Sequence, residues 1–170
     1  MTPPAVRLRH WADGDLPLLE RTLGDAELTA HLGGPEPEAK IRDRHLRYLR
    51  MGDPDAGTMF VILAGADVTP AGTHGYWKRL ADGQAVWETA WIVLPEFQGR
   101  GIATRATQLM AERAWADAPD RPIHAYPSVD NPASNAVCRK AGFRLIGAFD
   151  FEYPPGHQLR CNDWVLDPPH

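Results

Sequence analysis

The stretch from Trp91 to Thr104, with the sequence WIVLPEFQGRGIAT, decides how the rest of the chain is interpreted. Its apolar first part predicts a strand, Pro95 interrupts that strand, and helical spacing begins directly after Gly99 and Gly101. Unpaired backbone N–H groups and the positive end of the dipole stabilise an anion at a helix N-terminus. Glycines allow a ligand to come close to the backbone. The stretch therefore predicts a phosphate-binding loop between a strand and a helix.

Two common nucleotide-binding loops do not fit this stretch. The pair Gly99 and Gly101 resembles half of a dinucleotide fingerprint, but the third glycine is missing and antiparallel strands precede the loop. A P-loop ends in Gly-Lys-Ser or Gly-Lys-Thr, whereas Ile102 follows Gly101 here. We therefore exclude a dinucleotide-binding fold and nucleotide hydrolysis.

Strand and helix patterns extend outward from the loop in both directions. Upstream, the sequence predicts a strand over 6–10, a helix whose buried face is Leu16, Leu19 and Leu23, a helix over 36–50, and consecutive antiparallel strands over 59–63, 72–78 and 84–94. Downstream, it predicts a helix over 99–116, a strand over 122–126, a helix over 132–141 ended by Gly142, and strands over 143–149 and 161–166. The chain is thus expected to be of the α/β (α+β) class.

Length and composition limit the functions to consider. The chain has 170 residues, 44% of them hydrophobic and 24% charged, which predicts one globular domain over residues 1–170. The formal net charge of −4 does not favour nucleic acid or an acidic membrane. The sequence contains no apolar run long enough for a membrane span or a signal peptide, so a cytoplasmic location is expected. Cys138 and Cys161 are expected to be free thiols, and no metal site is indicated.

The predicted helix over 36–50 has a strongly basic side. Its apolar side is expected to be Ile41, His45, Leu46, Tyr48 and Leu49, and its basic residues are Lys40, Arg42, Arg44, Arg47 and Arg50. Charges on a surface helix ordinarily face solvent, so we interpret the basic side as a solvated face.

The segments around the loop resemble the GCN5-related N-acetyltransferase (GNAT) superfamily. Its acetyl-coenzyme A loop begins with Gln or Arg and ends with Gly-x-Gly or Gly-x-Ala, which Gln98, Gly101 and Ala103 match. The resemblance extends to 88–91, to 95–97, and to 131–135 and 140–143, in the same order and spacing. The first strand and the helices after it resemble the branch that contains ribosomal-protein N-terminal acetyltransferases.

The resemblance implies a mixed, mostly antiparallel, twisted sheet that is flanked by helices and splayed open where acetyl-CoA binds. Carried over position by position, it implies that the backbone of Ile92 and Val93 pairs with the pantetheine arm, that the loop holds the diphosphate, and that Asn131 and Ser134 contact the cofactor. The loop residues concerned are Gly99, Arg100, Gly101, Ile102, Ala103 and Thr104. Asn131 followed by Pro132 is equally typical of a turn and helix cap.

Glu88 is the general-base candidate for attack of an amine on the thioester. It resembles the acidic residue that the superfamily carries on this strand, although a surface carboxylate would look the same in the sequence. His74 and His124 are alternative bases. Cys138 stands where many members carry a tyrosine that protonates the leaving thiolate, and we expect it only to pack. Tyr126 is an alternative acid.

One further pattern is open to more than one interpretation. Trp77, Trp87 and Trp91 are expected to belong at least partly to the core rather than to an acceptor pocket.

The expected activity is acetylation of a primary amine on a small molecule by direct attack. A protein N-terminal or lysine acetyltransferase and a catalytically silent CoA-binding module are the alternatives. The superfamily also suggests a homodimer.

Overall fold

The computed structural model describes residues 2–170, and in that range seven strands form one sheet in the order β1-β2-β3-β4-β5-β7-β6. The strands are β1 (Val6–His10), β2 (Gly57–Ala64), β3 (Thr69–Ala81), β4 (Gln84–Val93), β5 (Ile123–Ala125), β6 (Arg144–Glu152) and β7 (Gln158–Leu166). Neighbouring strands are antiparallel except β4 and β5, which run parallel. The predicted mixed, mostly antiparallel sheet is confirmed.

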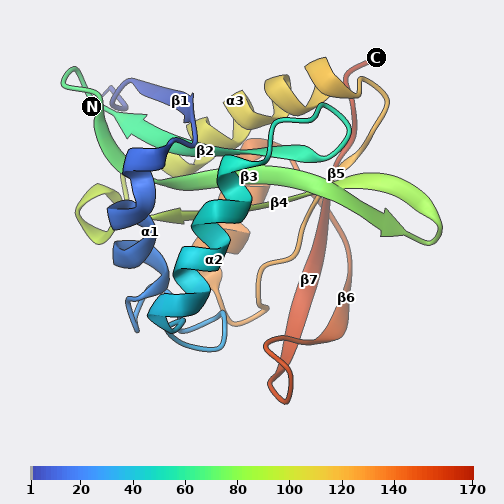
Figure 1. Ribbon diagram of the computed structural model, residues 1–170. Coiled ribbons are helices and arrows are strands. Elements are labelled where there is room, and N and C mark those ends of the chain that lie inside the picture. Colours follow the sequence, from blue (N-terminus) through green and yellow to red (C-terminus); the bar gives the residue numbers. More distant parts are fainter. Residues whose placement is uncertain (1) are drawn as a thin grey trace.

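Helices cover both faces of this sheet, as Figure 1 shows. The α-helices are α1 (Leu16–Leu23), α2 (Glu38–Leu49), α3 (Ile102–Asp117) and α4 (Pro132–Ala141), and short 3₁₀ turns lie at η1 (Asp13–Asp15) and η2 (Pro95–Phe97). Alternate residues of β4 point to opposite faces, so Trp87 packs with α3 whereas Ile92 packs with the core beneath α1 and α2. The sheet therefore has a core on each side.

Several predicted boundaries move for local reasons. The helix expected from Gly99 begins at Ile102, because Gly101 has φ +75°, which is not a helical conformation. The strands expected over 143–149 and 161–166 correspond to β6 and β7, which extend further toward the turn that joins them. They pair as a hairpin whose last pair before the turn is Glu152 and Gln158. Figure 1 shows this hairpin projecting away from the rest of the sheet.

The tryptophans do not form one group. Trp87 is fully buried beside α3, and Trp91 packs at the edge of the same core. Trp77 packs on the other face, in the core beneath α1 and α2. The expectation that part of the group belongs to the core is confirmed.

Helix α2 buries a narrower face than its sequence predicts. Ile41 and His45 are buried, but Leu46 is 53% exposed, because consecutive helical residues are rotated by about 100° about the axis. The expected basic side is neutralised in part, since Arg42 pairs with Glu38 of the same helix at 2.7 Å and Lys40 pairs at 3.5 Å with Glu36, which precedes the helix.

Residues 2–170 contain neither a membrane-spanning helix nor a cluster of metal-binding side chains. None of the helices there is both long and apolar enough to cross a membrane. The same residues contain no group of three or more His, Cys, Asp or Glu placed to hold a metal ion.

Candidate active site

The sheet opens between β4 and β5. The two strands pair only from Trp87 opposite Ile123 to Thr89 opposite Ala125, yet β4 continues to Val93. Residues 90–93 thus have β3 on one side and, among residues 2–170, no strand partner on the other. An unpaired strand edge offers backbone N–H and C=O groups to an extended ligand.

The hydrogen bonds of β4 identify the backbone groups at this edge. The Trp87 N–H donates to Pro122 O on the β5 side at 2.8 Å, and the Leu94 N–H donates to Ala71 O on the β3 side at 2.8 Å. Backbone groups alternate in direction along a strand, so those of Trp91 and Val93 face the opening. The Ile92 carbonyl instead points toward β3, where a Cβ added to Gly72 would lie 2.1 Å from it.

One of these groups is already used. The Gln98 side chain donates from Nε2 to the carbonyl oxygen of Val93 at 2.9 Å, which ties the loop to the end of β4. That bond explains why a glutamine suits position 98 and leaves the Val93 N–H free to face the opening.

The predicted phosphate loop joins β4 to α3 as the sequence indicates. Gly99 and Gly101 have φ values of +73° and +75°, a conformation that favours glycine, and a Cβ added to either would meet nothing within 4 Å. The first bond that enters the helix runs from the Arg105 N–H to Gly101 O at 3.0 Å, and no side chain caps the N-terminus. Within residues 2–170, the preceding N–H groups are therefore free for an anion.

Side chains of the loop divide into buried and open. Ile102 is 1% exposed and packs in the core, so only its backbone can contact a ligand. Ala103 and Thr104 are half-buried and Arg100 is exposed, with its guanidinium 6.0 Å from the centre of the Phe97 ring. The open backbone at Gly99 and Gly101 fits a diphosphate, which needs close approach and N–H donors.

The second expected cofactor segment starts α4. Asn131 is its N-cap, and its Oδ1 accepts the Ser134 N–H at 3.1 Å, so the capping interpretation holds and the Nδ2 group stays available. Sequence reasoning missed the importance of Asn135, which is 7% exposed. Its amide donates to Ser128 O and Asn131 O and accepts from Asn162 and Trp164, which fixes α4 to β7.

Glu88 lies on the α1–α2 face of the sheet and is the middle one of the three β4 residues that pair with β5. Its Oε2 accepts from Nη1 of Arg79 at 2.9 Å, and both side chains are partly exposed. Arg79 sits diagonally across the β3–β4 ladder from Glu88. The local sequence does not reveal this pair, because the two residues lie on different strands.

His124 lies beside Glu88 in the parallel pairing of β4 and β5. Its Nδ1 is 2.7 Å from Oδ1 of Asp163, and since a carboxylate only accepts, Nδ1 carries the proton and Nε2 is the free nitrogen. This arrangement orients the imidazole as a carboxylate does in other histidine-dependent sites.

His74 has a different environment. It is fully buried, its Nε2 lies 2.9 Å from Thr107 Oγ1, and burial lowers its pKa to about 3. His74 is therefore neutral and enclosed beneath α3, away from Glu88, which argues against its use as a base.

Cys138 packs as expected. It is fully buried in the core with α3, and burial raises the pKa of its thiol to about 12. Tyr126, directly after β5, is half-buried, and burial together with the charge of Asp163 raises its pKa to about 12. Tyr126 keeps its proton at neutral pH and can donate a hydrogen bond on the Glu88 face.

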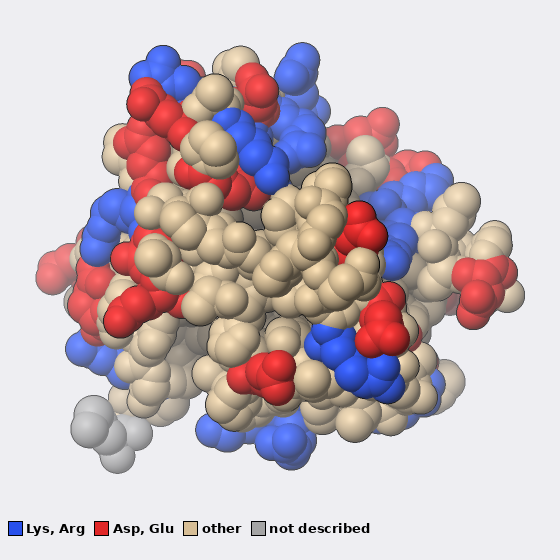
Figure 2. All heavy atoms as spheres, turned by 90° about the horizontal axis from the view of Figure 1, so that it is seen from below, with Lys and Arg blue, Asp and Glu red and all other residues tan. Residues whose placement is uncertain are grey.

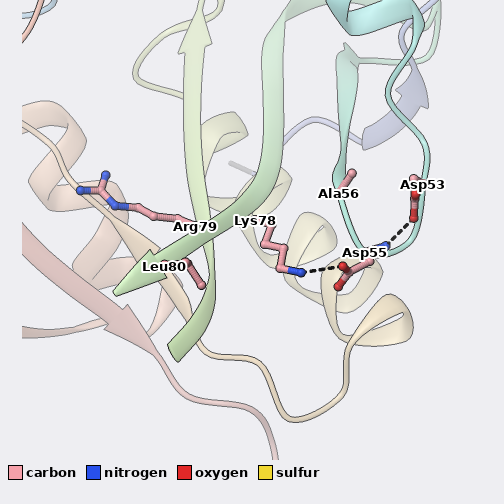
Figure 3. Close-up of a pocket in the computed structure, with 6 residues that line it drawn as sticks. All are labelled: Asp53, Asp55, Ala56, Lys78, Arg79 and Leu80. Carbon is pink, nitrogen blue, oxygen red and sulfur yellow. Dashed lines mark hydrogen bonds and ion pairs between the residues drawn. The ribbon is translucent and has the colours of Figure 1, made fainter. Parts of the chain in front are cut away.

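A surface hollow lies at the far end of β3, away from the loop. It is lined by Asp53, Asp55, Ala56, Lys78, Arg79 and Leu80. Asp55 pairs there with Lys78 at 2.6 Å. Figure 3 shows the Arg79 side chain extending away from this pair, because consecutive strand residues point to opposite faces. The hollow and the Glu88 site therefore share Arg79, whose guanidinium is turned toward Glu88.

An unpaired β4 edge that leads into a glycine-lined helix N-terminus defines a protein that binds an extended, phosphate-bearing ligand in a gap of its sheet. The chain belongs to the acetyltransferase (GNAT) domain family, which matches residues 5–144. A search of the curated proteins finds no match.

Solved structures share this fold at low sequence identity. Spermidine N-acetyltransferase from Vibrio cholerae in complex with CoA and spermine has a TM-score of 0.78 at 16% identity, over 96% of this chain and 95% of the other. The aminoglycoside acetyltransferase AAC(6')-Ib in complex with coenzyme A has a TM-score of 0.74 at 18% identity, over 96% of this chain and 95% of the other. A Salmonella typhimurium acetyltransferase that modifies the N-terminal serine of ribosomal protein L7/L12 has a TM-score of 0.78 at 21% identity, over 98% of this chain and 96% of the other.

Family membership confirms the predicted class of enzyme. The protein is an acetyl-CoA-dependent acyltransferase, and acetyl-CoA serves as its acyl donor without a metal. The solved structures act on different acceptors, so the acceptor has to be inferred from the residues of this chain.

Proposed function

We propose that this protein transfers the acetyl group of acetyl-CoA to the primary amine of a small molecule by direct attack. The observation that carries the proposal is the free β4 edge at residues 90–93, because it lies between the open glycine loop and Glu88. A cofactor laid along this edge has its diphosphate at one end and Glu88 near the other.

All but one of the residues expected from the sequence supply the cofactor contacts in this proposal. The pantetheine arm lies along Ile92 and Val93, with the N–H of Val93 as a donor at the open edge. The Ile92 carbonyl points toward β3 instead, so the expected backbone pairing of Ile92 with the arm is not part of this proposal. The diphosphate takes the free N–H groups of residues 99–104, with Arg100 and Thr104 as side-chain contacts. The Nδ2 group of Asn131 and the Ser134 hydroxyl complete the set from α4.

Bound acetyl-CoA supplies an activated acyl group. The chain itself must bind a neutral amine and accept its proton while the C–N bond forms and the C–S bond breaks. We assign proton acceptance to Glu88, directly or through water. Arg79 holds the carboxylate in place through its 2.9 Å contact with Oε2. His124 is the competing base, supported by its bond to Asp163.

A small acceptor is supported by the contact between α2 and the β6–β7 hairpin. The Tyr153 hydroxyl, at the hairpin tip, lies 3.1 Å from Nη2 of Arg44 and 3.4 Å from Oε1 of Glu36. This contact joins the hairpin tip to α2 and the segment before it, and in our proposal it restricts the approach of a folded protein. Acetylation of a protein N-terminus or lysine is the alternative, and a silent CoA-binding module is the alternative of another class.

One experiment separates the three proposals. Purified protein is incubated with acetyl-CoA and a panel of small amines and peptides, and the released CoA thiol is measured. Release with small amines supports the proposal, whereas release only with peptides supports the protein acetyltransferase. Binding of acetyl-CoA by calorimetry without release from any acceptor would identify a silent module.

A further inference from the structure

Four aromatic rings form a row on the Glu88 face of the sheet. They belong to Tyr126, which follows β5, to Phe149 and Phe151 of β6, and to Tyr153 at the hairpin tip. Successive ring centres lie 5.3, 6.2 and 6.3 Å apart. Phe149 and Phe151 share a face because they are two residues apart on one strand. We call these four residues the aromatic row.

The inner end of the aromatic row reaches the proposed base. The Arg79 guanidinium lies 4.6 Å from the centre of the Tyr126 ring and 6.0 Å from that of Phe151. The same guanidinium donates to Glu88 at 2.9 Å. A continuous line of contacts thus runs from the Glu88 carboxylate along the hairpin.

The outer end of the row is closed by α2 and the segment before it. Tyr153 contacts Arg44 and Glu36 through its hydroxyl, and Lys40 Nζ lies 5.3 Å from the centre of its ring. The rings between the two ends stay accessible, since Tyr126 and Phe149 are half-buried and Phe151 is 36% exposed. A ligand can therefore lie on the row with one end at Glu88.

The charges along the row argue against a polycation. Glu88 is paired with Arg79, Glu36 with Arg44 and Lys40, and Asp163 with His124. A polyamine needs several carboxylates free to pair with its ammonium groups. Glu88 and Glu36 already have cationic partners, and Asp163 already accepts the Nδ1–H of His124. On the face shown in Figure 2, acidic and basic side chains are also interspersed, without an extended acidic area.

We propose that the aromatic row is the acceptor subsite, and that the acceptor is an amine attached to an aromatic or large apolar group. This inference rests on the proposed function, since Glu88 marks where the amine is placed. Aromatic rings bind an apolar body by area burial and offset stacking, and their faces also attract a single ammonium group. A free arylalkylamine and a peptide whose first residue is aromatic share this chemistry, and the experiment below distinguishes them.

Binding to the CoA-saturated protein tests the inference without requiring turnover. Calorimetry compares 2-phenylethylamine with butylamine, with spermidine, and with short peptides that begin with Phe or Ser. We expect 2-phenylethylamine to bind at least about tenfold more tightly than butylamine or spermidine, because only it can stack on the rings. Preference for the Phe peptide over 2-phenylethylamine would identify a peptide as the source of the same chemistry.

Variants locate the binding site. Phe151→Ala changes an exposed ring and Phe149→Leu keeps the apolar volume, so neither should prevent folding. Each should weaken 2-phenylethylamine at least about fivefold without changing CoA affinity. Leu145→Ala is the matched control, since Leu145 is 52% exposed on the same strand but lies opposite Trp164, on the other face.

The inference is overturned if spermidine binds as tightly as 2-phenylethylamine. It is also overturned if Phe151→Ala and Phe149→Leu both bind 2-phenylethylamine with the affinity of the wild type. Acetyl transfer is measured separately by release of CoA. Ring-dependent binding without release from any amine would overturn the proposed function and leave the aromatic subsite in place.

Discussion

At the scale of single residues, the Arg79–Glu88 pair sets the conditions for the proposed chemistry. Replacement of Glu88 by Gln keeps the shape of the side chain but removes its basicity. We expect turnover to fall by about 10²- to 10⁴-fold, the usual contribution of a general base, while acetyl-CoA affinity is retained. The acidic limb of the pH–rate profile should vanish or move. Steady-state kinetics and calorimetry provide the two measurements.

His124→Gln is the matched comparison, because His124 lies beside Glu88 in the sheet and is the competing base. If Glu88→Gln loses less than roughly fivefold in rate and keeps the acidic limb, while His124→Gln loses both, the base is His124 and Asp163 orients it.

Cys138 provides a second prediction for a single residue. Its thiol is buried in the core and has a pKa near 12, so it cannot donate a proton to a leaving group at the opening. Cys138→Ala should leave turnover unchanged and lower the free energy of unfolding by about 1 kcal/mol, the cost of a small core truncation. A large loss of turnover in a variant with native stability would show that the thiol takes part in the reaction.

At the scale of the elements, the loop between β4 and α3 depends on glycine at φ +75° and on open space around it. Gly101→Val should weaken acetyl-CoA binding at least about tenfold, since the side chain occupies the space of the diphosphate and strains the backbone by about 1–2 kcal/mol. Calorimetry measures the affinity and thermal unfolding measures the strain.

Gly83 is a matched control for that strain. It has φ +78° in the turn between β3 and β4, and a Cβ added there also meets nothing within 4 Å. Gly83→Val should therefore lose comparable stability and keep its acetyl-CoA affinity. Equal affinities in both variants would contradict the assignment of the loop to the diphosphate.

At the scale of the whole molecule, the buried His74 makes the fold sensitive to acid. Its pKa is lowered from 6.5 to about 3 by burial, so between these values the unfolded chain binds one more proton than the folded protein. The stability contributed by the neutral ring is complete above pH 6.5 and is lost as the pH falls toward 3. Because of His74, the free energy of unfolding should decrease by up to about 1.4 kcal/mol for each pH unit below 6.5.

Denaturant unfolding at several pH values measures this dependence. His74→Gln removes the titration and can still donate to Thr107, so its stability should fall less steeply below pH 6.5. An unchanged slope in the variant would assign the acid sensitivity to other groups, such as Asp15 and Glu36, whose pKa values are lowered in ion pairs with Arg9 and Arg44.

The sequence alone determined the strand, loop and helix from Trp91 to Thr104, the upstream antiparallel strands and the exact bounds of α4. These features depend on local patterns: alternation on strands, helical spacing, and the glycines and prolines between them. The tertiary structure decided the placement of β7 between β5 and β6, the Arg79–Glu88 pair, the His124–Asp163 bond and the aromatic row. Each of these joins residues on different strands, and local periodicity carries no information about which distant strands become neighbours.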